Sequence, residues 1–335
     1  MGDTRVRNYN DIKWYRTILL QLRYGMGLQN RSFMADILAK TIRESLKFPG
    51  LRIDDTEQLH YRVNELKQQG YVHLGSVLAS EQVSAVFAHL QRAPLRDEAN
   101  NNSQEFTAED APPDVNVGSM AGVRPLSNCP HVLEVANTPE ILAAVEAFLG
   151  APATVQYYDA WWSFAGRSLP RNAQFFHYDR NCFRFVKLFL YLTDVGINDG
   201  PHVYVKGSSD VGDWTRLLEE AKRKEPSKVR RYLEMINSVR KEDRDVLDFF
   251  GNNRVHSLTG LAGDAFLVDT SGIHKGMLPN LNHRLVFQAT YALLPLLKDS
   301  PPPLNRNNLV ETCLAENGAV VDRAHLNYVN RIAVT

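Results

Sequence analysis

Apolar residues recur along the chain at two different spacings, which separate helices from strands. Where they lie three and four positions apart, they mark one face of an α-helix. Segments with this spacing, two of them followed by a glycine at the usual position of a helix end, are 57–69, 80–92 and 139–149. Residues 1–50 show the same spacing on both sides of Tyr24–Gly27, so we expect two further amphipathic helices there.

From residue 153 onward, short apolar or alternating runs are separated by turns rich in Gly, Asn and Asp. These runs, with an earlier one at 71–74, are predicted strands: 153–162, 174–177, 185–192, 203–205, 265–268 and 285–293. Many short strands with glycine-rich turns predict a sandwich or jelly roll with flanking helices.

Two segments do not fit this pattern of strands. Trp214–Phe250 is highly charged and helical in its spacing, so we expect a helical insert that projects over one mouth of the barrel. Asp97–Pro125 is rich in turn-forming residues and has little periodicity, which predicts a long loop.

Composition and charge narrow the classes of function. The 335 residues hold 38 Lys and Arg against 38 Asp and Glu, and this balance argues against a nucleic-acid partner. Residues 1–50 nevertheless carry nine basic against four acidic residues. A basic helical extension can bind a membrane surface or an acidic partner, but we expect this one to pack on the main domain.

Cysteine use and hydropathy indicate the compartment. Cys129, Cys182 and Cys313 form no close pair, which excludes a disulfide framework and a cysteine-rich zinc site. No apolar run is long enough for a membrane span, and the polar N-terminus does not resemble a signal peptide. We expect a cytoplasmic protein.

Candidate chemistry is concentrated at four residues. His177 and Asp179 are two positions apart in a predicted strand, so their side chains should point to the same face. His274 follows a later strand, and two histidines with one carboxylate form the facial triad of non-haem Fe(II) oxygenases. Arg284 opens the last predicted strand, and its guanidinium suits a bidentate grip on a carboxylate.

The chain resembles the phytanoyl-CoA dioxygenase family of Fe(II)/2-oxoglutarate oxygenases. The resemblance is carried by FFHYDRNCFRFVKLFLYLTDVGINDGPHVYVKGSS (175–209) and GDAFLVDTSGIHKGMLPNLNHRLVFQATY (263–291), and more weakly by ELKQQGYVHLGSVLASEQVSAVFAHL (65–90). It implies a double-stranded β-helix (a jelly roll, cupin-like) over 56–298. The helical insert expected from the residue pattern, at about 210–252, is longer than the family's usual connection. A basic helical extension at 1–55 and a C-terminal segment at 299–335 that packs on the domain complete the expected organisation.

The same resemblance implies an activity and its cofactors. Fe(II) would be held by His177, Asp179 and His274, and 2-oxoglutarate would be bound by Arg284. O2 would be used to hydroxylate an unactivated C–H bond of a small organic molecule, with release of succinate and CO2. Because Asp179 occupies the carboxylate position, halogenation is not expected, whereas desaturation and cyclisation stay open.

Further site residues follow with less support. Lys187, Phe189 and Tyr191 share one strand face near the position where the family binds 2-oxoglutarate. Contacts to substrate are expected from Gln174, Arg180, Tyr157 and His202, although a structural role for His202 at its turn is the simpler interpretation. Asp159 and Trp161 alternate with Tyr157 on one face and could contact substrate as well, although packing in the barrel is the simpler interpretation of Trp161. Ser209 stands where the family usually has histidine, which concerns the loop more than the metal ligands.

Two other classes of function stay open at this point. The chain could be an oxygen-independent, metal-binding cupin-like isomerase or hydrolase. In that case the position of Arg284 would not be explained by a dicarboxylic co-substrate. It could also be a non-catalytic binding protein that acts through its basic N-terminal helices. The pattern does not identify the substrate or the oligomeric state.

Overall fold

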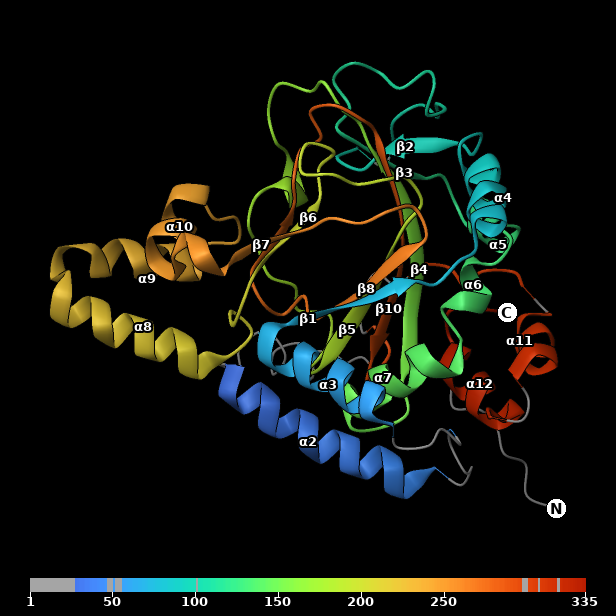
Figure 1. Cartoon of the computed structure of the whole chain (residues 1–335), viewed down its shortest axis with the longest axis horizontal. Helices are drawn as coiled ribbons and strands as arrows, with labels where there is room; N and C mark the ends of the chain where they lie inside the picture. The colour runs from blue at the N-terminus through green and yellow to red at the C-terminus, as the bar shows by residue number, and fades with distance from the viewer. Residues whose placement is uncertain are drawn as a thin grey trace.

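The computed structural model describes residues 28–46, 51, 56–100, 102–296, 301–306, 308–317 and 320–335. Two antiparallel sheets form the centre of this part of the chain (Figure 1). The larger has the strand order β1-β8-β5-β10-β4-β3-β2, and the smaller has the order β7-β6-β9. The strands are β1 (Tyr71–Ser76), β2 (Leu95–Asp97), β3 (Val117–Met120), β4 (Thr154–Ser163), β5 (Phe185–Tyr191), β6 (His202–Val205), β7 (Val255–Leu258), β8 (Asp264–Val268), β9 (His274–Gly276) and β10 (Arg284–Ala292).

Aromatic and aliphatic side chains pack between the two sheets. This inner cluster joins Phe189 of β5 and Phe266 of β8 to Tyr204 of β6 and Leu258 of β7. The predicted mainly β fold with flanking helices, of the jelly-roll or cupin type, is therefore confirmed.

Helices cover the outer face of the larger sheet. A separate and larger apolar cluster buries them against the strands, and it includes Leu66 of α3, Leu142 of α7 and Leu326 of α12. Gly70 and Gly150 end α3 and α7 in the left-handed conformation, with φ of 88° and 82°, as the sequence predicted. The helices on this side and at the C-terminus are α2 (Leu28–Ser45), α3 (Glu57–Gln69), α4 (Ser80–Leu90), α5 (Arg124–Ser127), α6 (Val132–Val135), α7 (Pro139–Leu149), α11 (Leu309–Asn317) and α12 (Arg323–Asn330).

The basic N-terminal segment is described only in part. Within it, α2 docks on the domain, because the Arg31 guanidinium donates to the Cys182 carbonyl at 2.7 Å and Asp36 pairs with Arg184 at 2.6 Å. The first of the two helices predicted within 1–50 lies outside the described residues.

The helical insert predicted between strands is confirmed. It consists of α8 (Val211–Lys224), α9 (Val229–Asn237) and α10 (Asp243–Phe250), which project from one side of the sheets (Figure 1). Its apolar faces form a cluster of their own around Trp214, Tyr232 and Phe249, and Phe176 and Ile273 of the central part join that cluster. The insert is thus packed directly onto segments that carry predicted site residues.

Several predicted elements differ from the structure. The strand predicted at 174–177 is absent: a 3-10 turn at Asn172–Gln174 is followed by isolated bridges from Phe176 to Lys241 and from His177 to His274. Because these successive residues pair with different segments, no continuous ladder forms. The loop predicted at 97–125 contains β3, while β7 and β9 lie outside all the predicted runs.

No helix in the described residues is long and apolar enough to cross a bilayer. Cys129, Cys182 and Cys313 are all buried, and none of them forms a disulfide bond within the described residues.

Candidate metal site and its cavity

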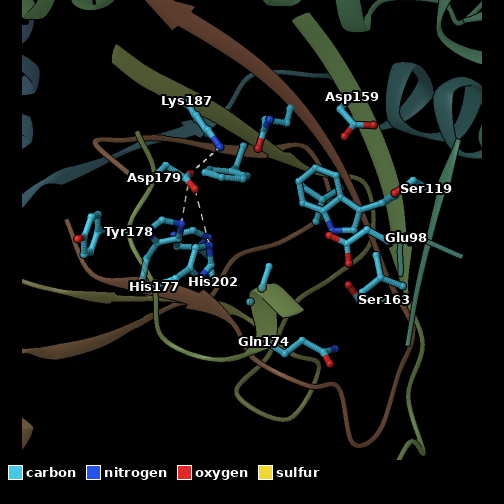
Figure 2. Close-up of a pocket in the computed structure, with 18 of the residues that line it drawn as sticks. Glu98, Ser119, Asp159, Ser163, Gln174, His177, Tyr178, Asp179, Lys187 and His202 are labelled. Carbon is cyan, nitrogen blue, oxygen red and sulfur yellow. Dashed lines mark hydrogen bonds and ion pairs between the residues drawn. The ribbon is translucent and has the colours of Figure 1, made fainter. Parts of the chain in front are cut away.

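A cavity of about 770 Å³ opens between the two sheets (Figure 2). Its floor is the inner face of β4, β10 and β5, where side chains at alternate positions form rows across the strands. From the strand registers, these rows are Trp161–Val286–Tyr191, Asp159–Gln288–Phe189 and Tyr157–Thr290–Lys187. The α9–α10 loop of the insert, 237–240, also lines the cavity.

His177, Asp179 and His274 converge at one side of this cavity. Their potential ligand atoms all lie within 4.8 Å of one another. The two histidines are held by a reciprocal pair of backbone hydrogen bonds of 2.9 and 2.8 Å, and the Asp179 amide donates to the Thr270 carbonyl at 2.8 Å. The convergence predicted for the His-x-Asp pair is therefore present, although an irregular segment produces it rather than a strand.

Hydrogen bonds also orient the two imidazoles. Nδ1 of His177 lies 2.9 Å from the Phe175 carbonyl, and Nδ1 of His274 lies 2.9 Å from the Gly272 carbonyl. Since a carbonyl can only accept, each Nδ1 carries the proton and each Nε2 presents a lone pair. These Nε2 atoms lie 3.8 and 3.6 Å from the Asp179 oxygens.

The electrostatics of the three groups match a cation-binding set. Burial lowers the pKa of His177 to about 3 and lowers the pKa of His274, so both rings are neutral near pH 7. Burial alone would raise the pKa of Asp179, but Lys187 and the two imidazoles bring it below its usual range. Two neutral imidazoles and one carboxylate suit a divalent transition metal.

Lys187 forms an ion pair with Asp179. Its Nζ lies 2.7 Å from Asp179 Oδ2, and this ion pair raises the pKa of Lys187 although burial opposes it. Lys187 faces Thr290, six residues along β10 from Arg284, which is a span of about 20 Å at about 3.3 Å per residue. The structure thus places Lys187 beside the triad rather than beside Arg284.

Arg284 is buried at the other end of the floor with neutral partners. Its Nη1 donates to the Gly200 carbonyl and its Nη2 donates to Ser163 Oγ at 3.1 Å. Within the described part of the chain it forms no ion pair, and its Nε, which is also buried, has no hydrogen-bond partner. Burial lowers the pKa of Arg284. A buried cation without a counter-charge fits a site for an anionic ligand.

The other predicted co-substrate residues lie between these two ends. The Tyr191 hydroxyl is engaged by the protein itself, because it donates to the Leu258 carbonyl at 2.6 Å and accepts from the His202 amide at 3.2 Å. Phe189 packs against His202 with ring centroids 4.7 Å apart, and His202 stacks on His274 at 5.2 Å.

The predicted substrate contacts all line the same cavity. Gln174 Oε1 accepts from Asn116 at 2.7 Å, which fixes its side chain, and Arg180 lies over the Tyr178 ring at 5.0 Å. Tyr157 stands in the floor row with Lys187. Sequence analysis missed Ser163, one residue beyond its predicted strand. It expected the insert to lie over one mouth of the barrel, and the α9–α10 loop of the insert lines the cavity.

Comparisons with known proteins place this site in context. No family model matches the sequence, and no curated protein matches it. The chain is similar in structure to SnoK, a non-haem α-ketoglutarate-dependent carbocyclase from nogalamycin biosynthesis, at 20% identity over 73% of this chain and 87% of that one, with a TM-score of 0.45. It is similar to SnoN, an α-ketoglutarate-dependent epimerase from nogalamycin biosynthesis (16% identity, 70% and 82% covered, TM-score 0.44). A third similar structure is HygX from Streptomyces hygroscopicus with nickel and 2-oxoglutarate bound, at 17% identity over 71% of this chain and 87% of that one, with a TM-score of 0.45. Likeness at this level does not identify an activity, so the geometry of the site has to support one.

Proposed function

We propose that this chain is a non-haem Fe(II)/2-oxoglutarate-dependent dioxygenase of the phytanoyl-CoA dioxygenase type that hydroxylates a small organic molecule. One observation carries the proposal. A single cavity holds two imidazoles that present Nε2 to a carboxylate and, beside Gly276 of the His274 strand, a buried guanidinium without a carboxylate partner.

His177, Asp179 and His274 would hold the metal, and Arg284 would bind the far carboxylate of 2-oxoglutarate. Bound iron with 2-oxoglutarate supplies the activation of O2 and the oxidising power for C–H hydroxylation, with succinate and CO2 as by-products. Lys187 neutralises one oxygen of Asp179 and orients the carboxylate, while Phe189 and His202 give that part of the cavity an aromatic lining.

The outcome we propose is hydroxylation. Asp179 occupies a coordination position that a halogenating enzyme would need for halide, which argues against halogenation. Desaturation and cyclisation share the hydrogen-abstraction step, and product analysis separates them from hydroxylation.

The test is to add Fe(II) and 2-oxoglutarate to the protein without oxygen and record the visible charge-transfer band of the chelate. We expect the band in the wild type and in His73→Ala, because His73 lies on β1 with its side chain 47% exposed. We expect no band in His274→Ala. Absence of the band from the wild type would refute the proposal and favour an oxygen-independent metal enzyme or a binding protein.

A further inference from the structure

One wall of the cavity differs in charge from the rest. Tyr157, Asp159 and Trp161 project from alternate positions of β4 into the cavity, and Figure 2 shows Asp159 across the cavity from Asp179 and His177. All three side chains are only partly buried, whereas the residues opposite them on β10 are buried. The wall is therefore open to a ligand.

Asp159 has no cationic partner on this wall. Among the described residues it forms no ion pair, and its Oδ1 accepts from the amide of Ala160, its own neighbour, at 2.8 Å. Lys187, the nearest cation of the floor, is engaged by Asp179 at 2.7 Å. Gln288, which faces Asp159 across the strands, donates its amide to Thr290 at 3.1 Å. A carboxylate in such a place is stabilised when a ligand brings the missing positive charge.

Neighbouring groups favour the same kind of ligand. Trp161 stands two residues along β4, with its ring perpendicular to that of Phe189 at a centroid distance of 6.3 Å, and its partly exposed indole adds an aromatic surface beside the carboxylate. Glu98, at the cavity mouth, adds a second negative charge close enough to raise the pKa of Asp159. Burial is the largest cause, the Ala160 amide and Lys187 oppose it in part, and the pKa of Asp159 is raised to about 7; a bound cation would lower it again.

We propose that Asp159, with Trp161 beside it, binds a protonated amino group of the substrate, so that the substrate is a small amine. That the bound amine is a substrate rests on the proposed function. That an amine binds at Asp159 does not. Of the cations that line the cavity, Lys187 pairs with Asp179, Arg284 donates to neutral groups and Arg240 lies near Glu98. An amine held at Asp159 would be oriented across the cavity from the triad, which would present the rest of the molecule to the metal.

The test uses two probes of equal size, 2-phenylethylammonium and 2-phenylethanol, titrated into the full chain without added metal and followed by ligand-observed NMR. We expect the wild type to bind the ammonium about tenfold more tightly than the alcohol. This preference should disappear in Asp159→Asn, persist in Asp159→Glu, and persist in Glu81→Gln, a control on the exposed side of α4. Trp161→Leu should weaken binding of the ammonium severalfold more than binding of the alcohol.

Failure of this inference can be told apart from failure of the proposed function. If the wild type shows no preference for the ammonium, or if Asp159→Asn keeps it, the amine site is refuted, whatever the result with Fe(II) and 2-oxoglutarate. If the preference is present but the charge-transfer band is not, the amine site stands and the oxygenase proposal falls.

Discussion

At the scale of single residues, Arg284 is the group that we propose to bind the far carboxylate of 2-oxoglutarate. We expect Arg284→Met to weaken 2-oxoglutarate binding by about 100-fold, since a charge-assisted bidentate pair contributes about 2–3 kcal/mol. Arg284→Lys should recover only part of this, because an ammonium lacks the planar fork. The measurement is calorimetric titration of 2-oxoglutarate into protein loaded with Zn(II), with Arg96→Met, which removes an exposed ion pair to Glu105, as the control. Unchanged affinity in Arg284→Met would exclude this role.

His177 makes the stability of the metal-free protein depend on pH. Burial lowers its pKa to about 3, whereas an unfolded histidine titrates near 6.5. Between these values the unfolded state binds more protons, so this contribution is complete above about pH 6.5 and is lost as the pH falls toward 3. We expect a loss of about 1.4 kcal/mol per pH unit from this group, measured by urea unfolding with a chelator present. His177→Asn should have a shallower slope by about one proton, and an equal slope would contradict the assignment.

At the scale of elements, the turn before β6 positions Arg284. Gly200 has φ of +70°, its carbonyl accepts from Arg284, and a Cβ placed there would lie 2.5 Å from the Met277 carbonyl oxygen. We expect Gly200→Ala to lower the free energy of unfolding by more than the strain of a positive φ would, because the added Cβ also clashes with the Met277 carbonyl. We expect the same change to weaken 2-oxoglutarate binding. Gly75→Ala is the matched control, because Gly75 has φ of +79° with nothing within 4 Å of the added Cβ. Thermal unfolding and 2-oxoglutarate titration of both variants test this, and equal effects would show that the close approach is unimportant.

The sequence allowed elements to be predicted where their determinants are local. α3 and α7 combine an apolar stripe with a terminal glycine, so both were predictable. β3 is only Val-Gly-Ser-Met, and it is a strand because β2 and β4 flank it, which no local pattern reports. Strand pairing over long distances accounts for most of what was missed.

The same distinction applies to the candidate site. The approach of His177 to Asp179 was predicted from a strand that the structure does not contain, and His274 was predicted from its place after a later strand and from the chemistry of a facial triad. That Lys187 is engaged by Asp179, and that the α9–α10 loop of the insert lines the cavity, depend on how distant segments pack. The pattern predicted which residue types converge, whereas the packing determines which of them neutralise one another.

At the scale of the whole molecule, the C-terminal segment supports the wall that we propose to bind substrate. Behind β4, three buried side chains form a closed ring of hydrogen bonds: Tyr158 donates to Asn330 at 2.7 Å, Asn330 donates to Asn137 at 2.8 Å, and Asn137 donates to Tyr158 at 2.9 Å. Tyr158 lies between Tyr157 and Asp159 in sequence and points to the opposite face of the strand. We therefore propose that residues 299–335 belong to the catalytic domain as an integral part of it.

This proposal predicts the effect of changing one residue far from the cavity. Asn330→Ala should destabilise the protein by about 1–3 kcal/mol, because it leaves buried groups of Asn137 and Tyr158 without a partner. Asn327→Ala, an exposed position on the same helix, should have an effect within about 0.5 kcal/mol. Urea unfolding gives both values. If the ring also holds β4 in place, binding of 2-phenylethylammonium should weaken in Asn330→Ala at temperatures where the variant is still folded, while binding of 2-oxoglutarate at Arg284 on β10 changes less. Equal stability of the two variants would show that the contacts of Asn330 do not stabilise the domain and would contradict the proposal.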